Sequence, residues 1–177
     1  MDSKGNILIP LSRADVESLA DQIAPMGFDS IAVGLIHSYL NPTHEKLVRE
    51  VLADKLPDVA VSISSEVSPQ MREYERFNTV VANAYIKHLM KSYLGRLKGR
   101  LADEDVQCDI FLMHSGGGII SLESAAEFPV RLVESGPAGG AVFAAHIAAR
   151  YGLDKVLSFD MGGTTAKICL IKNQTPK

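Results

Sequence analysis

Lys155-Val-Leu-Ser-Phe-Asp160-Met-Gly-Gly-Thr-Thr165, continued by Ala166-Lys167-Ile-Cys-Leu-Ile171, is the stretch that decides the fold of this chain. Two short apolar runs flank the pair Gly162 and Gly163, and this pattern predicts a strand, a tight turn and a second strand. Glycine adopts positive φ without steric cost and leaves the backbone bare of side chains. We therefore expect a hairpin whose turn exposes its backbone amides.

The turn carries residue types that bind phosphate and a metal ion. The successive N–H groups of Gly162 and Gly163 can form a concave anion site, and the hydroxyls of Thr164 and Thr165 are further donors. Asp160, at the end of the first strand, can hold Mg²⁺ through water, because Mg²⁺ keeps much of its hydration shell beside phosphate. The alternative is a hairpin whose loop is merely polar, since Asp-x-Gly-Gly also occurs in ordinary turns.

The composition is that of a globular protein. The chain has 177 residues, of which 46% are hydrophobic and 22% charged, a balance that excludes a disordered chain. This length allows one domain or parts of two. The net charge of −3 offers no electrostatic footprint for nucleic acid or for an anionic membrane. No apolar run reaches the length of a membrane span, and the polar start is no signal peptide.

The chain contains only two cysteines, Cys108 and Cys169. Each lies in or beside a strand-like run. We therefore expect buried, reduced thiols rather than a disulfide or a metal pair, which fits a cytoplasmic protein.

Apolar periodicity predicts alternating helices and strands in the first hundred residues. In order, these are a helix from Ser12 to about Met26-Gly27, a strand over 30–36, a helix from Asn41-Pro42, a strand over 59–63 and a long helix over 71–101. The long helix has an expected core-facing stripe of Phe77, Val81, Tyr85 (or Ala84), Leu89, Tyr93 and Leu97. Its expected exposed side carries Lys87, Lys91, Arg96, Lys98 and Arg100.

The second half continues the alternation. The predicted elements are a strand over 108–113, a short helix over 122–127, a strand-like run over 130–133 and an alanine-rich helix over 141–151 that stops at Gly152. Strands that alternate with helices predict an α/β fold with a mainly parallel sheet and flanking helices.

Two more glycine turns precede the hairpin. The first is His114-Ser115-Gly116-Gly117-Gly118, and the second runs from Ser135 through Gly136, Gly139 and Gly140. In open α/β sheets, ligands bind beyond the carboxyl ends of the strands, where such turns lie. The second turn opens a helix, so its free N–H groups can face phosphate. Neither is a P-loop or a Gly-x-Gly-x-x-Gly turn. Each alone is explained by a tight turn of the backbone that requires glycine. Together with the hairpin they favour a nucleotide site.

Other candidates are weaker. His114-Ser115 lacks the Gly-x-Ser-x-Gly elbow of a hydrolase, and no acid is placed to complete a triad. The five histidines show no metal-ligand spacing. His44-Glu45 is interpreted as a solvated helix cap. The polar residues around Pro69 are either a charged helix start or a substrate contact; they are Glu66, Glu73, Tyr74, Glu75 and Arg76.

Seven motifs occur in a recognisable order over nearly the whole chain: His37-Ser-Tyr-Leu-Asn-Pro-Thr-His-Glu45, Ser65-Glu-Val-Ser-Pro69, Arg72-Glu-Tyr-Glu-Arg76, Asn83-Ala-Tyr85, Ser115-Gly-Gly-Gly118, Ser135-Gly-Pro-Ala-Gly139 and Asp160-Met-Gly-Gly-Thr164. In these motifs the chain resembles the hydantoinase A/oxoprolinase family. That family includes ATP-dependent N-methylhydantoinase, 5-oxoprolinase and acetone carboxylase subunits.

The resemblance implies part of an actin-like ATPase (ribonuclease H-like) fold, in which two lobes hold ATP. In that family a comparable Asp-x-Gly-Gly-Thr turn lies near the start of the protein, and the turn at Asp160 looks like its partner in the second lobe. Residues 1–134 would then form the C-terminal part of the first lobe. Residues 135–177 would form the connecting helix and the phosphate-binding hairpin of the second lobe.

The resemblance also implies a reaction and its site residues. The reaction is phosphorylation of a carbonyl oxygen by ATP with Mg²⁺, used to open cyclic amides such as hydantoins or 5-oxoproline, with a hydantoinase B-type partner subunit. Asp160 would be the catalytic and metal residue. The cofactor-binding residues would be Gly162, Gly163, Thr164, Thr165, Lys167, Ser115, Gly116, Gly117, Gly136, Gly139 and Gly140. Many members have Asp at the position of Lys167, so a second carboxylate for the metal is missing here.

Two alternatives stay open. Within the family, the alternative is an acetone-carboxylase-type carboxylase subunit. From another class, the alternative is a non-catalytic binding or assembly module that uses the long helix as a partner surface. An exposed apolar stripe on that helix would favour the module, and full burial against a sheet would exclude it.

Overall fold

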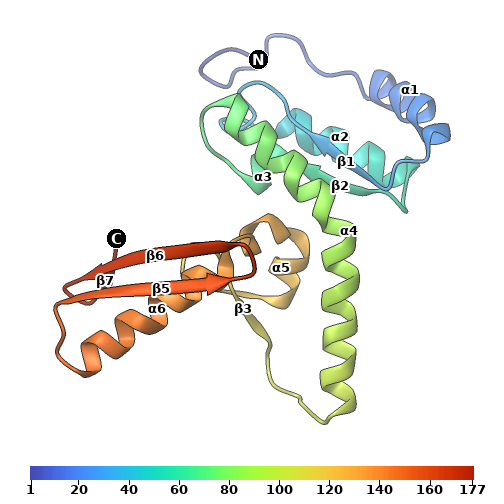
Figure 1. Cartoon of the computed structure of the whole chain (residues 1–177). Helices are drawn as coiled ribbons and strands as arrows, with labels where there is room; N and C mark the ends of the chain where they lie inside the picture. Colours follow the sequence, from blue (N-terminus) through green and yellow to red (C-terminus); the bar gives the residue numbers. More distant parts are fainter. The chain divides into compact units, whose positions relative to one another are not determined.

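The computed structural model describes residues 1–177 as two compact units, Met1–Leu97 and Lys98–Lys177 (Figure 1). Helix α4 (Glu73–Asp103) begins in the first unit and ends in the second. The boundary expected between residues 134 and 135 concerns the lobes of a larger fold, and it remains a prediction. No helix of the chain is long and apolar enough to cross a membrane.

The first helix of the N-terminal unit has the predicted bounds. Helix α1 (Arg13–Ile23) begins after Ser12, whose hydroxyl accepts a hydrogen bond from the Asp15 amide at 3.3 Å. A serine at this position satisfies one of the amides that the first helical turn leaves unpaired. The helix continues into the 3₁₀ turn η1 (Ala24–Met26) and stops at Gly27, which adopts a φ of 69°.

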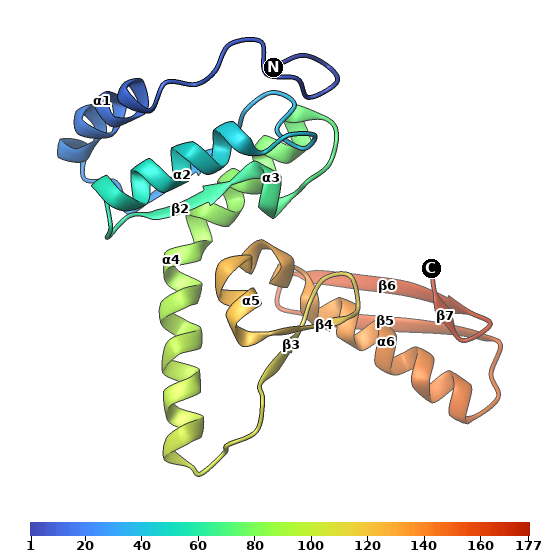
Figure 2. The ribbon, with the colours of Figure 1, turned by 180° about the vertical axis from the view of Figure 1, so that it is seen from behind.

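The N-terminal unit is built around one parallel strand pair (Figures 1 and 2). Strands β1 (Ser30–Val33) and β2 (Ala60–Ile63) pair in register from Ser30 opposite Ala60 to Val33 opposite Ile63. Helix α2 (Thr43–Lys55) connects them, because parallel strands need a crossover. The core between helices and sheet consists of Ala20, Val33, Leu52 and Ile63. The short helix α3 (Ser64–Val67) follows β2.

Helix α4 turns a different face inward than the sequence predicts. Its buried residues include Val80, Asn83 and Lys87. Four residues of the expected core stripe are exposed instead, whereas Phe77 and Leu97 are half-buried and Ala84, the alternative to Tyr85, is buried. The exposed fractions are 57% for Val81, 84% for Tyr85, 66% for Leu89 and 50% for Tyr93. The predicted core face of α4 is therefore wrong, and so is the predicted exposure of Lys87.

Hydrogen bonds to β2 explain the orientation of α4. The amide of the Asn83 side chain donates to Ser62 Oγ at 3.0 Å, and Lys87 Nζ donates to the Val61 carbonyl at 3.1 Å. A buried polar group is tolerated only when it is paired, and these pairs satisfy groups of the strand as well. The long methylene chain of lysine also covers apolar surface while its ammonium reaches a carbonyl.

The C-terminal unit contains two antiparallel sheets. Strands β3 (Phe111–Met113) and β4 (Ile119–Ser121) form one hairpin, and β5 (Lys155–Gly162), β6 (Thr165–Lys172) and β7 (Thr175–Pro176) form the other sheet. Helix α5 (Leu122–Glu127) has the predicted bounds. Only β1 and β2 are parallel, so the chain is a mixed α/β protein, and the prediction of a mainly parallel sheet is wrong.

Three further predictions fail in this unit. The run over 130–133 belongs to the 3₁₀ turn η2 (Pro129–Leu132) rather than to a strand, because Pro129 starts a turn with its fixed φ and lacks an N–H for a ladder. Helix α6 (Ser135–Arg150) begins six residues earlier than expected and includes the second glycine turn. Both cysteines are free as predicted, but Cys108 is exposed and Cys169 is only half-buried, so the predicted burial is wrong.

Candidate functional site

The glycine hairpin at Asp160 has the predicted form. Strands β5 and β6 pair from Lys155 opposite Lys172 to Gly162 opposite Thr165. This pairing leaves Gly163 and Thr164 as a two-residue loop, and Gly163 adopts a φ of 47°. Such loops require positive φ, which favours glycine. A methyl group added at Gly162 or Gly163 would meet no atom within 4 Å, so the tip is open on all sides.

Beside this hairpin lies an open pocket of about 310 Å³. Its walls come from all three predicted turns: Ser115 from the first, Pro137 and Ala138 from the second, and Asp160 and Lys167 from the hairpin. Asp160 and Lys167 face each other across the two strands, because they are paired residues in the register. The pocket therefore brings together polar groups from three separate parts of the sequence.

The other predicted phosphate-binding residues do not line this pocket. Gly162, Gly163, Thr164 and Thr165 lie at the hairpin tip, and Gly136 and Gly140 lie within α6. Gly116, Gly117 and Gly139 are also outside it. Their roles as cofactor-binding residues remain predictions.

Close packing accounts for some of the glycines in the first two turns, but not for Gly136 and Gly140, where an added methyl group would meet no atom within 4 Å. The Gly116 amide donates to His114 Nδ1 at 2.9 Å, which closes the β3–β4 turn. A methyl group added at Gly117 would lie 3.2 Å from Val142 of α6, and one added at Gly139 would lie 3.5 Å from Met113. The contact at Gly139 is an ordinary one, whereas Gly117, with its positive φ and its tight contact to Val142, lets the β3–β4 hairpin approach α6.

Glu134 is a pocket residue that the sequence analysis missed. Lys167 Nζ donates a hydrogen bond to its carboxylate, and both side chains line the pocket with Asp160. Glu134 directly precedes α6 and adopts a left-handed φ of 66°. An acid beside the first turn of a helix is favoured by the unpaired amides there. The sequence signal was the acid immediately before Ser135-Gly-Pro.

The pocket fits a hydrated magnesium ion better than a fully protein-bound metal. No group of three or more His, Cys, Asp or Glu side chains is placed to hold a metal. Mg²⁺ beside phosphate commonly takes only one or two carboxylates and fills its other positions with water and phosphate oxygens. Asp160 and Glu134 are two carboxylates that line this pocket. Lys167 adds one positive charge, which suits an anionic ligand.

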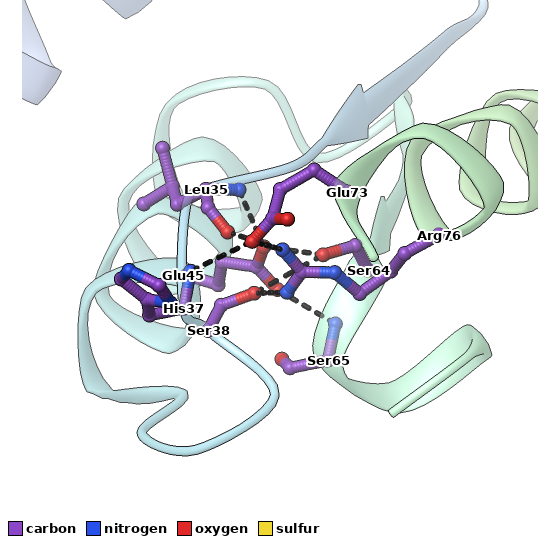
Figure 3. A network of polar contacts seen from close by, with 8 residues as sticks. All are labelled: Leu35, His37, Ser38, Glu45, Ser64, Ser65, Glu73 and Arg76. Carbon is purple, nitrogen blue, oxygen red and sulfur yellow. Dashed lines mark hydrogen bonds and ion pairs between the residues drawn. The ribbon is translucent and has the colours of Figure 1, made fainter. Parts of the chain in front are cut away.

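A second polar site is buried in the N-terminal unit (Figure 3). Glu45 of α2 is fully buried, and its carboxylate accepts hydrogen bonds from the Leu35 amide at 2.8 Å, Ser64 Oγ at 2.6 Å and the Ser65 amide at 2.8 Å. Leu35 follows β1, and Ser64 and Ser65 follow β2. The carboxylate therefore ties together the segments that leave the carboxyl ends of both parallel strands.

Arg76 of α4 is the cation of this network and is also fully buried. Its guanidinium donates to Ser38 Oγ, to the Leu35 carbonyl at 2.9 Å and to Glu73 at 3.3 Å. It also lies over the rings of Tyr39 and Phe77, at 5.5 Å and 5.2 Å from their centroids. Stacking and hydrogen bonding together compensate for the loss of water around the charge.

Two hydroxyls connect the buried cation to the buried anion. Ser64 gives its only proton to Glu45, so in the 3.2 Å contact between Ser38 and Ser64 the proton comes from Ser38. Ser38 in turn accepts from Arg76. All donors thus point from Arg76 toward Glu45, and bonds aligned in this way strengthen one another.

This network corrects the interpretation of Glu45 as a solvated cap. Burial by itself would raise the pKa of Glu45, but the hydrogen bonds from Ser64, Ser65 and Leu35 outweigh it and hold the pKa below its usual 4.5. Glu45 is therefore a buried, ionised group and not a solvated cap. The signal was its helical spacing, because Glu45 lies three and seven residues before Val48 and Leu52, on the core face of α2.

Three polar atoms of the same region are buried without a hydrogen-bond partner: His37 Nδ1, Ser65 Oγ and Arg76 Nε. His37 also adopts a left-handed φ of 60°, which is uncommon outside glycine. The hydrogen bonds of the network hold the segments at the sheet edge together, and the substrate contact considered for Arg76 remains a prediction.

The fold is that of a mixed α/β protein, and an open pocket lies between its glycine hairpin and the start of α6. The chain matches the Hydantoinase/oxoprolinase family over residues 76–177 and the Hydantoinase/oxoprolinase N-terminal region over residues 1–56. Because the first match covers more than half of the chain, the chain belongs to the hydantoinase/oxoprolinase family.

Similar proteins agree with this assignment. The chain is 38% identical over 176 residues to an uncharacterised protein of Methanocaldococcus jannaschii, covering 99% of this chain and 26% of that protein. It is 32% identical over 170 residues to caprolactamase subunit alpha of Pseudomonas jessenii, covering 96% and 24%. The chain therefore spans about a quarter of the length of these relatives.

Two solved structures share the fold. The ATP-dependent caprolactamase of Pseudomonas jessenii superposes with a TM-score of 0.86 at 32% identity, covering 96% of this chain and 25% of that one. Nucleotide-free acetone carboxylase superposes with a TM-score of 0.85 at 26% identity, covering 98% and 25%.

Proposed function

We propose that this chain is part of an ATP-dependent amidohydrolase that opens cyclic amides or imides, such as hydantoins or 5-oxoproline. The observation that carries the proposal is the pocket in which Asp160, Glu134 and Lys167 meet beside the glycine hairpin. The name of one solved relative, an ATP-dependent caprolactamase, joins ATP to a cyclic amide and supports the proposal. The ketone carboxylation named for another relative is the alternative within the family.

The proposed arrangement is that of an actin-like ATPase. Residues 1–134 would contribute to one lobe, and residues 135–177 would contribute the connecting helix α6 and the phosphate-binding hairpin to the other. Relatives named as alpha, beta and gamma subunits support a partner subunit of the hydantoinase B type.

The charged residues of the pocket and the residues of the hairpin tip have distinct proposed roles. When bound, ATP supplies a phosphoryl group that makes a poorly electrophilic carbonyl carbon reactive. Asp160 and Glu134 orient water molecules of the Mg²⁺ shell, and Lys167 contacts phosphate. The amides of Gly162 and Gly163 and the hydroxyls of Thr164 and Thr165 donate to phosphate oxygens. Positioning and charge neutralisation are the main contributions a protein makes to phosphoryl transfer.

The test uses the complete protein that carries this segment, together with its partner subunit. Hydantoins, 5-oxoproline and ketones are each offered with Mg·ATP, and phosphate release is measured. We expect release to depend on a cyclic amide and to fall at least about 100-fold in Asp160→Asn. ATP turnover with none of these compounds would refute the proposal, and turnover with ketones alone would favour the carboxylase alternative.

A calorimetric titration with Mg·ATP examines the 177-residue chain itself. Only one of the two Asp-x-Gly-Gly-Thr turns expected for the family is present in the sequence. We therefore expect weak or undetectable binding and no turnover, because preorganised position and charge from both lobes are required. Micromolar binding with hydrolysis that depends on Asp160 would contradict the division into lobes.

The binding or assembly module is a second candidate function. The exposed stripe on α4, rather than a buried one, is the observation that favours it.

A further inference from the structure

The charged side chains of the pocket beside the hairpin balance one another. Glu134 and Asp160 contribute two carboxylates, and Lys167 and Lys177 contribute two ammonium groups. The remaining lining residues are apolar residues, two serines and a cysteine. A free polyphosphate therefore gains little net attraction from this wall, although lysines lie in it.

Glu134 pairs with a lysine of the hairpin rather than with its own helix. It directly precedes α6, where a side chain commonly accepts from the first helical amides, but its carboxylate makes no such capping bond. Lys167 Nζ of β6 donates to this carboxylate instead. The backbone of Glu134 has a φ of 66°, a conformation that suits glycine or asparagine better than glutamate. The carboxylate, and not the backbone, is therefore what fits glutamate to this position.

The ion pair limits what Lys167 can bind. A carboxylate in contact with the ammonium offsets its charge and so weakens its attraction for a phosphate oxygen. Only one carboxylate oxygen takes part in the contact. Such a single contact is easier to exchange than a two-oxygen bridge of the kind that arginine makes. Lys167 can thus be released when another cation takes the carboxylate of Glu134.

We propose that Glu134 makes this site select the magnesium complex of a nucleotide over the free nucleotide. Without a divalent cation, Glu134 neutralises Lys167, and the pocket offers phosphate no net positive charge. When the carboxylates of Glu134 and Asp160 turn to a hydrated cation, the ammonium of Lys167 becomes available to a phosphate oxygen. The inference deepens the proposed function and rests on its nucleotide site. By linkage, cation and nucleotide each raise the affinity of the site for the other by the same factor.

Equilibrium binding of AMP-PNP, a non-hydrolysable ATP analogue, to the complete protein tests this inference. Calorimetry compares its affinity in excess EDTA with its affinity in excess Mg²⁺, so the readout is binding and not turnover. In EDTA, Glu134→Gln should bind the analogue about 3- to 10-fold more tightly than the wild type, because the freed Lys167 then attracts phosphate. The factor by which Mg²⁺ tightens binding should fall about 10-fold or more.

Two comparisons separate the ion pair from a mere change of charge. Glu123→Gln breaks the ion pair with Lys98, which lies outside the pocket, and it should bind like the wild type in both conditions. The double variant Glu134→Gln with Lys167→Gln lacks the freed ammonium, so in EDTA it should bind no more tightly than the wild type. Glu134→Asn removes the same charge and suits the left-handed backbone, so it should behave like Glu134→Gln. Circular dichroism confirms that each variant is folded.

The outcomes distinguish this inference from the proposed function. Metal-free affinity that is unchanged or weaker in both Glu134→Gln and Glu134→Asn would overturn the inference, and so would a tightening that persists in the double variant. Either result, with Mg²⁺-dependent binding of the analogue intact in the wild type, leaves the proposed function standing. Failure of the wild type to bind the analogue with or without Mg²⁺ would overturn the nucleotide site and the inference together.

Discussion

The substitution Glu45→Gln gives the sharpest test of the buried polar network. Glutamine keeps the shape of the side chain and one acceptor oxygen, but it replaces the other oxygen with an N–H₂ group. If its oxygen stays with Leu35 and Ser64, the N–H₂ group faces the Ser65 amide, which then has no acceptor. The variant therefore removes a charge and leaves the Ser65 amide without an acceptor, and it creates no cavity.

The expected cost is about 3 kcal/mol of unfolding free energy. An unpaired buried donor costs about 1–3 kcal/mol, and each of the two remaining bonds loses about 1 kcal/mol when its acceptor is no longer charged. Part of this loss, about 1 kcal/mol, is offset because a neutral amide costs less to bury than a carboxylate. Urea unfolding followed by circular dichroism at pH 7 measures the difference.

The matched control is Glu50→Gln on the same helix. Glu50 is 61% exposed and pairs only with Arg13 at the surface, so its loss should change stability by less than about 1 kcal/mol. A result for Glu45→Gln as small as that of the control would refute the account of the network.

The effect should also depend on pH with a known sign. The pKa of Glu45 in the folded state lies below the unfolded value of 4.5. Its ionised form therefore stabilises the protein fully above pH 4.5, and this contribution is lost as the pH falls through the folded pKa. The difference between the wild type and Glu45→Gln should shrink below pH 4.5. A difference that stays constant on acidification would mean that the charge of Glu45 is not what stabilises the fold.

Two further substitutions test local packing and capping. In Gly34→Ala the new methyl group would lie 2.5 Å from Phe77, a ring packed under Arg76, so we expect a loss of about 1–3 kcal/mol in urea unfolding. In Ser121→Ala helix α5 loses the hydroxyl that accepts from the Ser124 amide at 3.2 Å, which should cost about 1 kcal/mol, and Ser121→Asn should recover most of it. Equal stability of the alanine and asparagine variants would contradict the capping role.

Local signals were sufficient where neighbouring residues determine the structure. The cap at Ser12 and the stop at Gly27 depend on short-range hydrogen bonds and on backbone freedom, so the bounds of α1 follow from the sequence. The hairpin at Gly163 follows for the same reason. Helix α5 was placed at its observed bounds from Leu122 to Glu127.

The predictions failed where residues that are far apart in the sequence determine the structure. Periodicity of apolar residues assigned the wrong face of α4, because Asn83 and Lys87 find their acceptors on β2, about twenty residues earlier in the chain. Likewise, the burial of Glu45 depends on donors that follow two different strands. A polar residue at a core-facing position of a helix can therefore be buried when hydrogen-bond partners from other segments surround it.

The pocket shows the same dependence on distant residues, and it changes the meaning of Lys167. From the sequence alone, a lysine where many family members have aspartate removes a carboxylate from the expected metal site. The structure pairs Lys167 with Glu134, thirty-three residues earlier, in the pocket that also contains Asp160. Asp160, Glu134 and Lys167 then share one cavity, together with Lys177. In the proposed nucleotide site, the two side-chain carboxylates would suit hydrated Mg²⁺, and Lys167 would add a positive charge for phosphate. Under the proposed function, Glu134 would therefore supply the carboxylate that is lost where Lys167 replaces aspartate.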